Sequence, residues 1–77
     1  NWDYLNRIFK KATGYSLVQY IQYYRILVSK RLLAEKTCTI TEAGTKVGFD
    51  TPSYFTKVFK KWTDMTPYEY YNRSEGR

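Results

Sequence analysis

The sequence predicts an all-helical fold, and three observations support that prediction. Alternation between apolar and polar side chains, the pattern typical of a half-buried strand, is confined to stretches of at most five residues, such as residues 37–41. Ser or Thr stands where a helix N-cap is expected at positions 16, 39, 51 and 66. Two segments also repeat each other closely, which indicates one helical element present in two copies.

The repeat relates residues 4–20 to residues 54–70. Six of the 17 aligned positions are identical and most others keep their chemical type, so we interpret the segments as equivalent elements. Two copies are too few for a solenoid, but they are enough for two matching sites on one ligand. The identical pairs are Tyr4/Tyr54, Phe9/Phe59, Lys10/Lys60, Lys11/Lys61, Thr13/Thr63 and Tyr20/Tyr70.

Gly14 and Ser16 mark the boundary between the first two helices. Gly14 follows the apolar run of the first repeat, as a left-handed C-cap does. Ser16 and Gln19 have the spacing of a capping box and predict a long helix through about Lys36. This helix is apolar on two sides, which is typical of a helix placed between two cores. One side carries Leu17, Tyr20, Ile21, Tyr24, Val28 and Leu32, and the nearly opposite side carries Ile26 and Leu33.

The second half of the chain has the outline of a helix-turn-helix. Thr39 and Glu42 form another capping box and predict a short helix over about residues 40–46. Residues 47–50 form a tight turn, and a cap residue followed by proline at residues 51–52 starts a longer helix. A Thr-Pro-Tyr-Glu motif near the C-terminus combines both devices and predicts a last short helix.

Each repeat has an apolar face and a polar, basic face at helical spacing. The inward residues are Leu5, Ile8, Phe9 and Ala12 in the first repeat and Phe55, Val58, Phe59 and Trp62 in the second. The outward residues are Asp3, Asn6, Arg7 and Lys10 in the first repeat and Ser53, Thr56, Lys57 and Lys60 in the second. One such stripe alone is ordinarily a solvated surface. Because it occurs twice behind a helix-turn outline, we interpret it as a ligand-binding surface.

The composition favours a polyanionic partner and argues against catalysis. Thirteen Lys and Arg against seven acidic residues give a net charge of +6, which suits a nucleic acid or an anionic membrane. With no histidine and only Cys38, the chain lacks the commonest general base and cannot assemble a zinc-type cluster. We therefore expect no enzyme, no metal and no cofactor. The single thiol and the lack of a long apolar run favour a cytoplasmic protein with no membrane partner.

Specific motifs lie along the whole chain. They are residues 14–17, 20–21, 25–26 and 32–33 in the long helix, and residues 39–42, 47–49, 53–55, 59–61 and 66–70 after it. With these motifs the chain resembles the DNA-binding region of AraC/XylS-type bacterial transcription regulators over essentially all 77 residues. The resemblance implies two helix-turn-helix units joined by a linker helix, with the recognition helices in successive major grooves of double-stranded DNA.

The resemblance also implies a domain organisation. Residues 1–15 form the recognition helix of a first helix-turn-helix that is truncated at its N-terminus, residues 16–37 form the linker helix, and residues 38–77 form the second helix-turn-helix with a C-terminal helix. The family usually has Ile-Ala where Ala43-Gly44 stand. Glycine inside a helix costs about 0.5–1 kcal/mol relative to alanine. Asp64 replaces a usual cap glycine, so we expect strain or an altered cap there.

The recognition helices are expected to divide base readout from phosphate binding. Asn6 suits adenine, and Arg7 and Lys57 suit guanine. Phosphate contacts set register and salt dependence without reading sequence. The expected base readers are Asp3, Asn6, Arg7, Ser53, Thr56 and Lys57, and the expected phosphate contacts are Lys10, Lys11, Lys60 and Lys61.

Five further residues keep a second interpretation. Asp3 either accepts from cytosine or caps its helix, and Trp2 either contacts a thymine methyl group or anchors preceding helices. Packing is favoured over readout for Tyr4 and Tyr54. Cys38 is expected to be an ordinary surface thiol.

Two other classes of function stay open. In one, Tyr23, Ile26 and Leu27 dock a sensor domain or RNA polymerase, and DNA contact is vestigial. In the other, the chain is a basic amphipathic segment on an anionic membrane, although its short capped helices argue against this. In the DNA-binding interpretation, the partners are double-stranded DNA, RNA polymerase and a sensor or dimerisation domain outside this chain.

Overall fold

The computed structural model describes residues 1–75 and contains five helices and no strand in that range. They are α1 (Trp2–Thr13), α2 (Leu17–Glu35), α3 (Ile40–Lys46), α4 (Pro52–Thr63) and α5 (Pro67–Glu75). The all-helical prediction is confirmed. None of these helices combines the length and apolar character needed to cross a membrane.

The helix starts follow the predicted caps. At α2 the Ser16 amide donates to Gln19 Oε1 (3.0 Å) and the Gln19 amide donates to Ser16 Oγ (3.1 Å), which completes a capping box. The same reciprocal pair opens α3 between Thr39 and Glu42. It also opens α5, because the residue 66 amide donates to the residue 69 carboxylate at 2.9 Å. These contacts join residues three apart, so local sequence is sufficient to specify them.

The repeat is also present in the hydrogen bonds that end α1 and α4. The Thr13 hydroxyl donates to the carbonyl of Phe9 (2.9 Å) and accepts from the amide of residue 15 (3.1 Å). At the end of α4 the Thr63 hydroxyl donates to the carbonyl of Phe59 (2.8 Å) and accepts from the amide of residue 65 (3.1 Å). The turns that end the two helices therefore have the same hydrogen-bond pattern.

A left-handed residue follows each of these turns. Gly14 has φ 85° and Asp64 has φ 64°, and each cap amide donates to the carbonyl four residues earlier. The predicted left-handed cap at Gly14 is confirmed. At Asp64 the cap keeps the same hydrogen bond, but the backbone of this residue has a left-handed conformation that residues with a side chain rarely adopt.

Asp64→Gly is expected to raise the free energy of unfolding by about 0.5–1 kcal/mol, because glycine adopts this conformation without steric cost. Urea unfolding followed by circular dichroism measures the change. Asp64→Asn is a suitable control, since asparagine tolerates the left-handed region and keeps a side chain of similar size. A glycine variant no more stable than the parent chain would contradict the expected strain.

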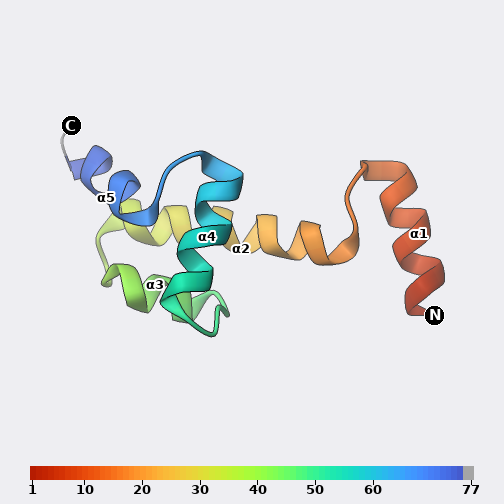
Figure 1. Cartoon of the computed structure of the whole chain (residues 1–77). Coiled ribbons are helices and arrows are strands. Elements are labelled where there is room, and N and C mark those ends of the chain that lie inside the picture. Colours follow the sequence, from red (N-terminus) through yellow and green to blue (C-terminus); the bar gives the residue numbers. More distant parts are fainter. Residues whose placement is uncertain (76–77) are drawn as a thin grey trace.

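The helices are arranged around α2 (Figure 1). Helices α3, α4 and α5 gather around the C-terminal part of α2, whereas α1 stands at its other end. Among the helices of residues 1–75, α1 contacts α2 alone. The result is an elongated molecule with principal extents of 44 × 23 × 19 Å.

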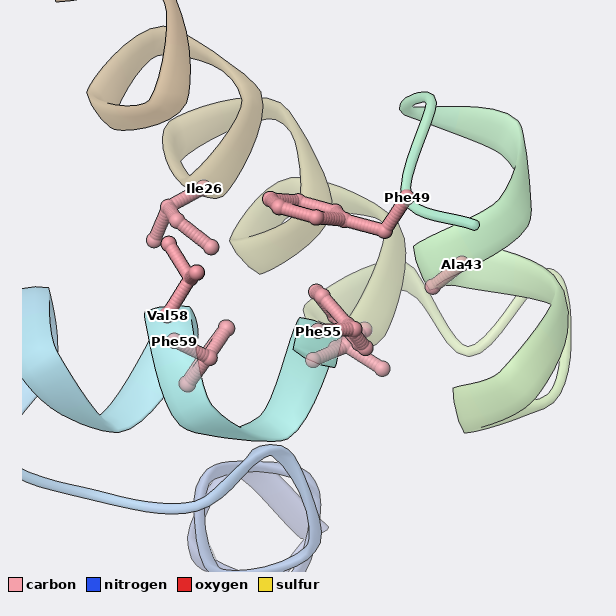
Figure 2. Packing of buried hydrophobic residues seen from close by; sticks show 7 residues of the cluster. Ile26, Ala43, Phe49, Phe55, Val58 and Phe59 are labelled. Atoms are coloured by element: carbon pink, nitrogen blue, oxygen red, sulfur yellow. The ribbon is translucent and has the colours of Figure 1, made fainter. Parts of the chain in front are cut away.

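The core lies between α2, α3 and α4, and α5 packs against it through Tyr70 and Tyr71. Figure 2 shows Ile26 of α2 pointing toward Val58 of α4, with aromatic side chains of α4 and of the preceding turn beside them. The rings of Phe55 and Phe59 meet edge to face at 5.7 Å between centroids. The buried apolar residues are Ile26, Leu33, Ala43, Phe49, Phe55, Val58 and Phe59.

Only one of the two apolar sides of α2 is buried. Ile26, Ser29 and Leu33 face the core, and the Ser29 hydroxyl donates to the carbonyl of Ile26 at 2.8 Å. On the other side Tyr20 and Tyr24 are 46% and 60% exposed. The expectation of a helix wedged between two cores is therefore met on one side only within residues 1–75.

The glycine that costs helix propensity in α3 has a packing reason. A Cβ on Gly44 would lie 2.6 Å from Cδ2 and 2.8 Å from Cγ of Phe55, closer than real side chains pack. Phe55 is itself buried. Gly44 and the small Ala43 thus let α3 approach α4 closely, and the Phe55 ring fills the space that a larger pair would occupy.

The predicted inward face of α1 is mostly exposed. Leu5 and Ile8 are 57% and 50% exposed, and Ala12 is exposed as well. Phe9 alone of the four residues is half-buried, with its ring edge to face against Tyr20 at 5.2 Å. The other three are exposed within the described residues, because α2 is the one helix there that α1 contacts.

Candidate nucleic-acid interface

The outer face of α4 presents the polar stripe that the sequence predicted. One side of the helix is buried through Phe55, Val58 and Phe59, which fixes the direction of the opposite side. The side chains on that opposite side reach solvent on a helix with no acidic residue. The exposed residues are Ser53, Thr56, Lys57, Lys60 and Lys61.

Two polar contacts hold the helix-turn-helix to α2. Gln22 Nε2 donates to the hydroxyl of Tyr54 (2.8 Å), in the first turn of α4. Arg25 Nη1 donates to the carbonyl of Gly48 (3.3 Å), in the turn between α3 and α4. The sequence analysis missed both contacts, because the partners lie 32 and 23 residues apart and no local motif marks them.

Helix α1 presents a similar outer face. Asp3, Arg7, Lys10 and Lys11 are all exposed. Asn1 caps the helix, with its Oδ1 accepting from the amide of residue 4 at 2.8 Å. The alternative in which Asp3 is the cap is therefore wrong, and its carboxylate lies in the first turn, where the helix dipole favours a negative charge.

Asn6 has a contact that the sequence did not indicate. Its side chain is half-buried, and its Oδ1 accepts from the backbone amide of Leu17 at 2.9 Å. Leu17 is the first residue of α2, so this bond satisfies an amide that the helix leaves unpaired. A bidentate contact to adenine requires the same oxygen. In this conformation Asn6 connects α1 to α2 and has only its amide nitrogen left to donate.

The aromatic residues of the two repeats differ in environment. Tyr54 packs its ring on Phe49 at 5.9 Å, in agreement with the packing role expected for it. Tyr4 and Trp2 are 57% and 56% exposed. Cys38 is a half-buried free thiol that packs against the core, so it is less exposed than the expected surface thiol.

The basic side chains on these two faces are available to an external anion. Within the described residues, the ion pair is Arg31 with Glu35 on α2, at 3.7 Å. The basic residues of α1 and α4 form no ion pair in that part of the chain. Exposed, unpaired cations can neutralise phosphates and displace their counterions. No group of three potential metal ligands occurs among the described residues.

Helices α1 and α4 end in turns with the same hydrogen-bond pattern, and each has an exposed basic face. These features define a helix-turn-helix DNA-binding domain. A family model described as a helix-turn-helix domain matches residues 3–73. The chain belongs to this family of AraC/XylS-type helix-turn-helix domains, and the resemblance inferred from the sequence is confirmed.

Individual relatives agree with this assignment. The chain is 36% identical over 78 residues to the uncharacterized transcriptional regulatory protein YesN of Bacillus subtilis, covering 99% of the chain and 21% of that protein. It is 36% identical over 66 residues to the arabinose operon regulatory protein of Escherichia coli, covering 86% of the chain and 23% of that protein. The chain thus spans less than a quarter of either regulator.

A solved structure also matches. It is a protein of unknown function from Listeria innocua, with a TM-score of 0.85 and 32% sequence identity. The match covers 95% of this chain and 70% of that chain. The arrangement of the helices therefore has a counterpart in a longer polypeptide.

Proposed function

We propose that the chain binds double-stranded DNA sequence-specifically as part of a bacterial transcription regulator, with α1 and α4 in successive major grooves. The observation that carries this proposal is the structural repeat, since the two helices end in turns with the same hydrogen-bond pattern and present basic outer faces. In Figure 1 both helices also run steeply to the long axis of α2. Equivalent elements of this kind suit the repeating geometry of a duplex.

The dimensions support simultaneous contact with two grooves. The molecule is 44 Å long, which exceeds the roughly 34 Å of one turn of DNA. The 19 residues of α2 span about 28 Å at about 1.5 Å per residue. Helix α2 therefore separates the two recognition helices along the long axis of the molecule.

Each exposed residue has a role in this proposal. Arg7 and Lys57 read guanine, Ser53 and Thr56 make less discriminating contacts, and Asp3 accepts from cytosine. Because the Asn6 oxygen is bonded to Leu17, we assign Asn6 to holding α1 on α2 rather than to reading adenine. Phosphate contacts fall to Lys10, Lys11, Lys60 and Lys61.

Partners beyond DNA are part of the same proposal. The relatives extend well past the matched region, which is where we place a sensor or dimerisation domain and contacts with RNA polymerase. A bacterial regulator of this kind acts in the cytoplasm, where the chromosome lies. Docking through Ile26 is disfavoured, because that side chain is 1% exposed and fills the core.

Footprinting tests the proposed geometry. A duplex selected from random DNA is expected to show two protected major-groove segments about one turn, roughly 34 Å, apart on one face. Arg7→Ala is expected to weaken protection of one segment only, because Arg7 lies on α1. Protection confined to a single half-turn and unaffected by Arg7→Ala would contradict the two-groove arrangement.

A further inference from the structure

A series of five aromatic rings connects α1 to α4, and we call it the aromatic chain. It starts in α1 with Phe9, which meets Tyr20 at 5.2 Å between centroids. Tyr20 lies 6.5 Å from Tyr23, its neighbour on α2. Tyr23 meets Trp62 of α4 at 5.1 Å, and Trp62 meets Tyr15 at 5.6 Å. The chain thus passes from one recognition helix through α2 to the other and returns to the link between α1 and α2.

Trp62 is the member that joins the two units. It lies in the last turn of α4, and its ring touches Tyr23 on α2 and Tyr15 between α1 and α2. Its Nε1 is buried and has no hydrogen-bond partner among the described residues. A buried tryptophan N–H usually has a partner. The ring therefore occupies this site for its apolar contacts and not for a hydrogen bond.

Tyr15 is held from both sides. Its amide donates to the Thr13 hydroxyl in the turn that ends α1, and the next residue, Ser16, caps α2. Within residues 1–75, α1 contacts no other helix than α2. The Tyr15–Trp62 contact therefore joins α4 directly to the turn that sets the direction of α1.

We infer that the aromatic chain fixes the orientation of α1 relative to α4, which makes Tyr15 and Trp62 positioning residues for two-groove binding. This inference rests on the proposed function. When one recognition helix is bound, the other meets its groove as a tethered group, and its effective concentration depends on how narrowly its direction is restricted. Breaking the aromatic chain lowers that concentration without removing any DNA contact.

The test compares two DNA duplexes. One is a two-site duplex selected from random DNA with the unaltered full chain, and the other keeps only the half that α4 protects. Tyr15→Ala is expected to weaken binding to the two-site duplex by about tenfold and to leave binding to the single-site duplex within about twofold. The residue is 45% exposed and lies outside α4, so its loss does not disturb the core.

Two further variants serve as controls. Tyr68→Ala removes a tyrosine that is 65% exposed on α5 and has no ring contact among the described residues, so it is expected to change neither affinity. Trp62→Phe keeps an aromatic ring in place and removes the unpaired N–H, so it is expected to retain two-site binding, whereas Trp62→Ala is expected to weaken two-site binding at least as much as Tyr15→Ala does.

The loss of affinity on changing the spacing between the half-sites is a measurement that general destabilisation of the fold does not alter. One base pair inserted between them is expected to weaken binding by the unaltered chain more than binding by Tyr15→Ala, because the variant tolerates other orientations of α1. Equal spacing sensitivity, or unchanged two-site affinity in Tyr15→Ala, overturns the inference while leaving the proposed function intact. Failure of the unaltered chain to select any duplex overturns the proposed function itself.

Discussion

Replacing Phe59 by alanine is expected to lower the free energy of unfolding by about 3–5 kcal/mol, the usual range for a buried phenylalanine. Phe59 is fully buried, and its ring lies 5.7 Å from those of Phe55 and Tyr70. The substitution leaves a cavity where α2, α4 and α5 meet. Small domains have only about 5–15 kcal/mol of stability in total. We therefore expect the variant to lose a large part of its stability, measured as a lower midpoint of urea unfolding and a lower melting temperature.

The repeat provides a matched control for this experiment. Phe9 occupies the equivalent position in α1 but is only half-buried. Phe9→Ala removes the same atoms, and we expect it to cost about 1–2 kcal/mol, because less apolar area returns to water. Equal losses for the two variants would contradict the assignment of the core to the second unit.

Replacing Lys57 by alanine is expected to cost on the order of 1–3 kcal/mol of DNA-binding free energy and to relax the preference at one or two base pairs. Lys57 is exposed on α4 on the side away from buried Phe55 and Phe59. A cation placed in the major groove discriminates guanine by its O6 and N7 acceptors. Selection from random DNA, followed by titration at several salt concentrations, measures both effects.

Lys60→Ala is the matched control, since it removes the same side chain one turn further along α4. It is expected to weaken binding to all sequences alike and to reduce the salt dependence by about one unit of slope. If both variants kept the base preference of the parent chain, Lys57 could not be a reader. A change of folding stability in either variant is not expected, because both side chains are exposed.

Local sequence alone determined where the helices of this protein begin and end. Ser16, Thr39 and Thr66 each form a capping box with the residue three positions later, as predicted. Gly14 adopts the left-handed cap that its place after an apolar run indicated. Such contacts are closed within one helical turn, so they depend little on how the rest of the chain folds. The repeat of residues 4–20 in residues 54–70 could be found in the sequence for the same reason, because equivalent turns require equivalent residues.

The candidate site could be predicted in part. The outer face of α4 agrees with the sequence prediction, because burial of Phe55 and Phe59 leaves Lys57 and Lys60 on the opposite side. The role of Asn6 could not be predicted. Its bond to Leu17 spans 11 residues and depends on the angle at which α1 meets α2, which helical spacing does not specify.

Only the tertiary structure decided which apolar surfaces are buried and how the recognition helices are held. Both sides of α2 had the residues for burial, yet the core formed on the side of Ile26. Gly44 lowers the helix propensity of α3, and the reason for a glycine at this position is seen only in the tertiary structure, where the Phe55 ring packs against it. Trp62 was expected to face a core, and its ring in addition contacts Tyr15, in the link between α1 and α2. These outcomes depend on the distances and angles between helices, which arise from all packing contacts together and not from any short segment.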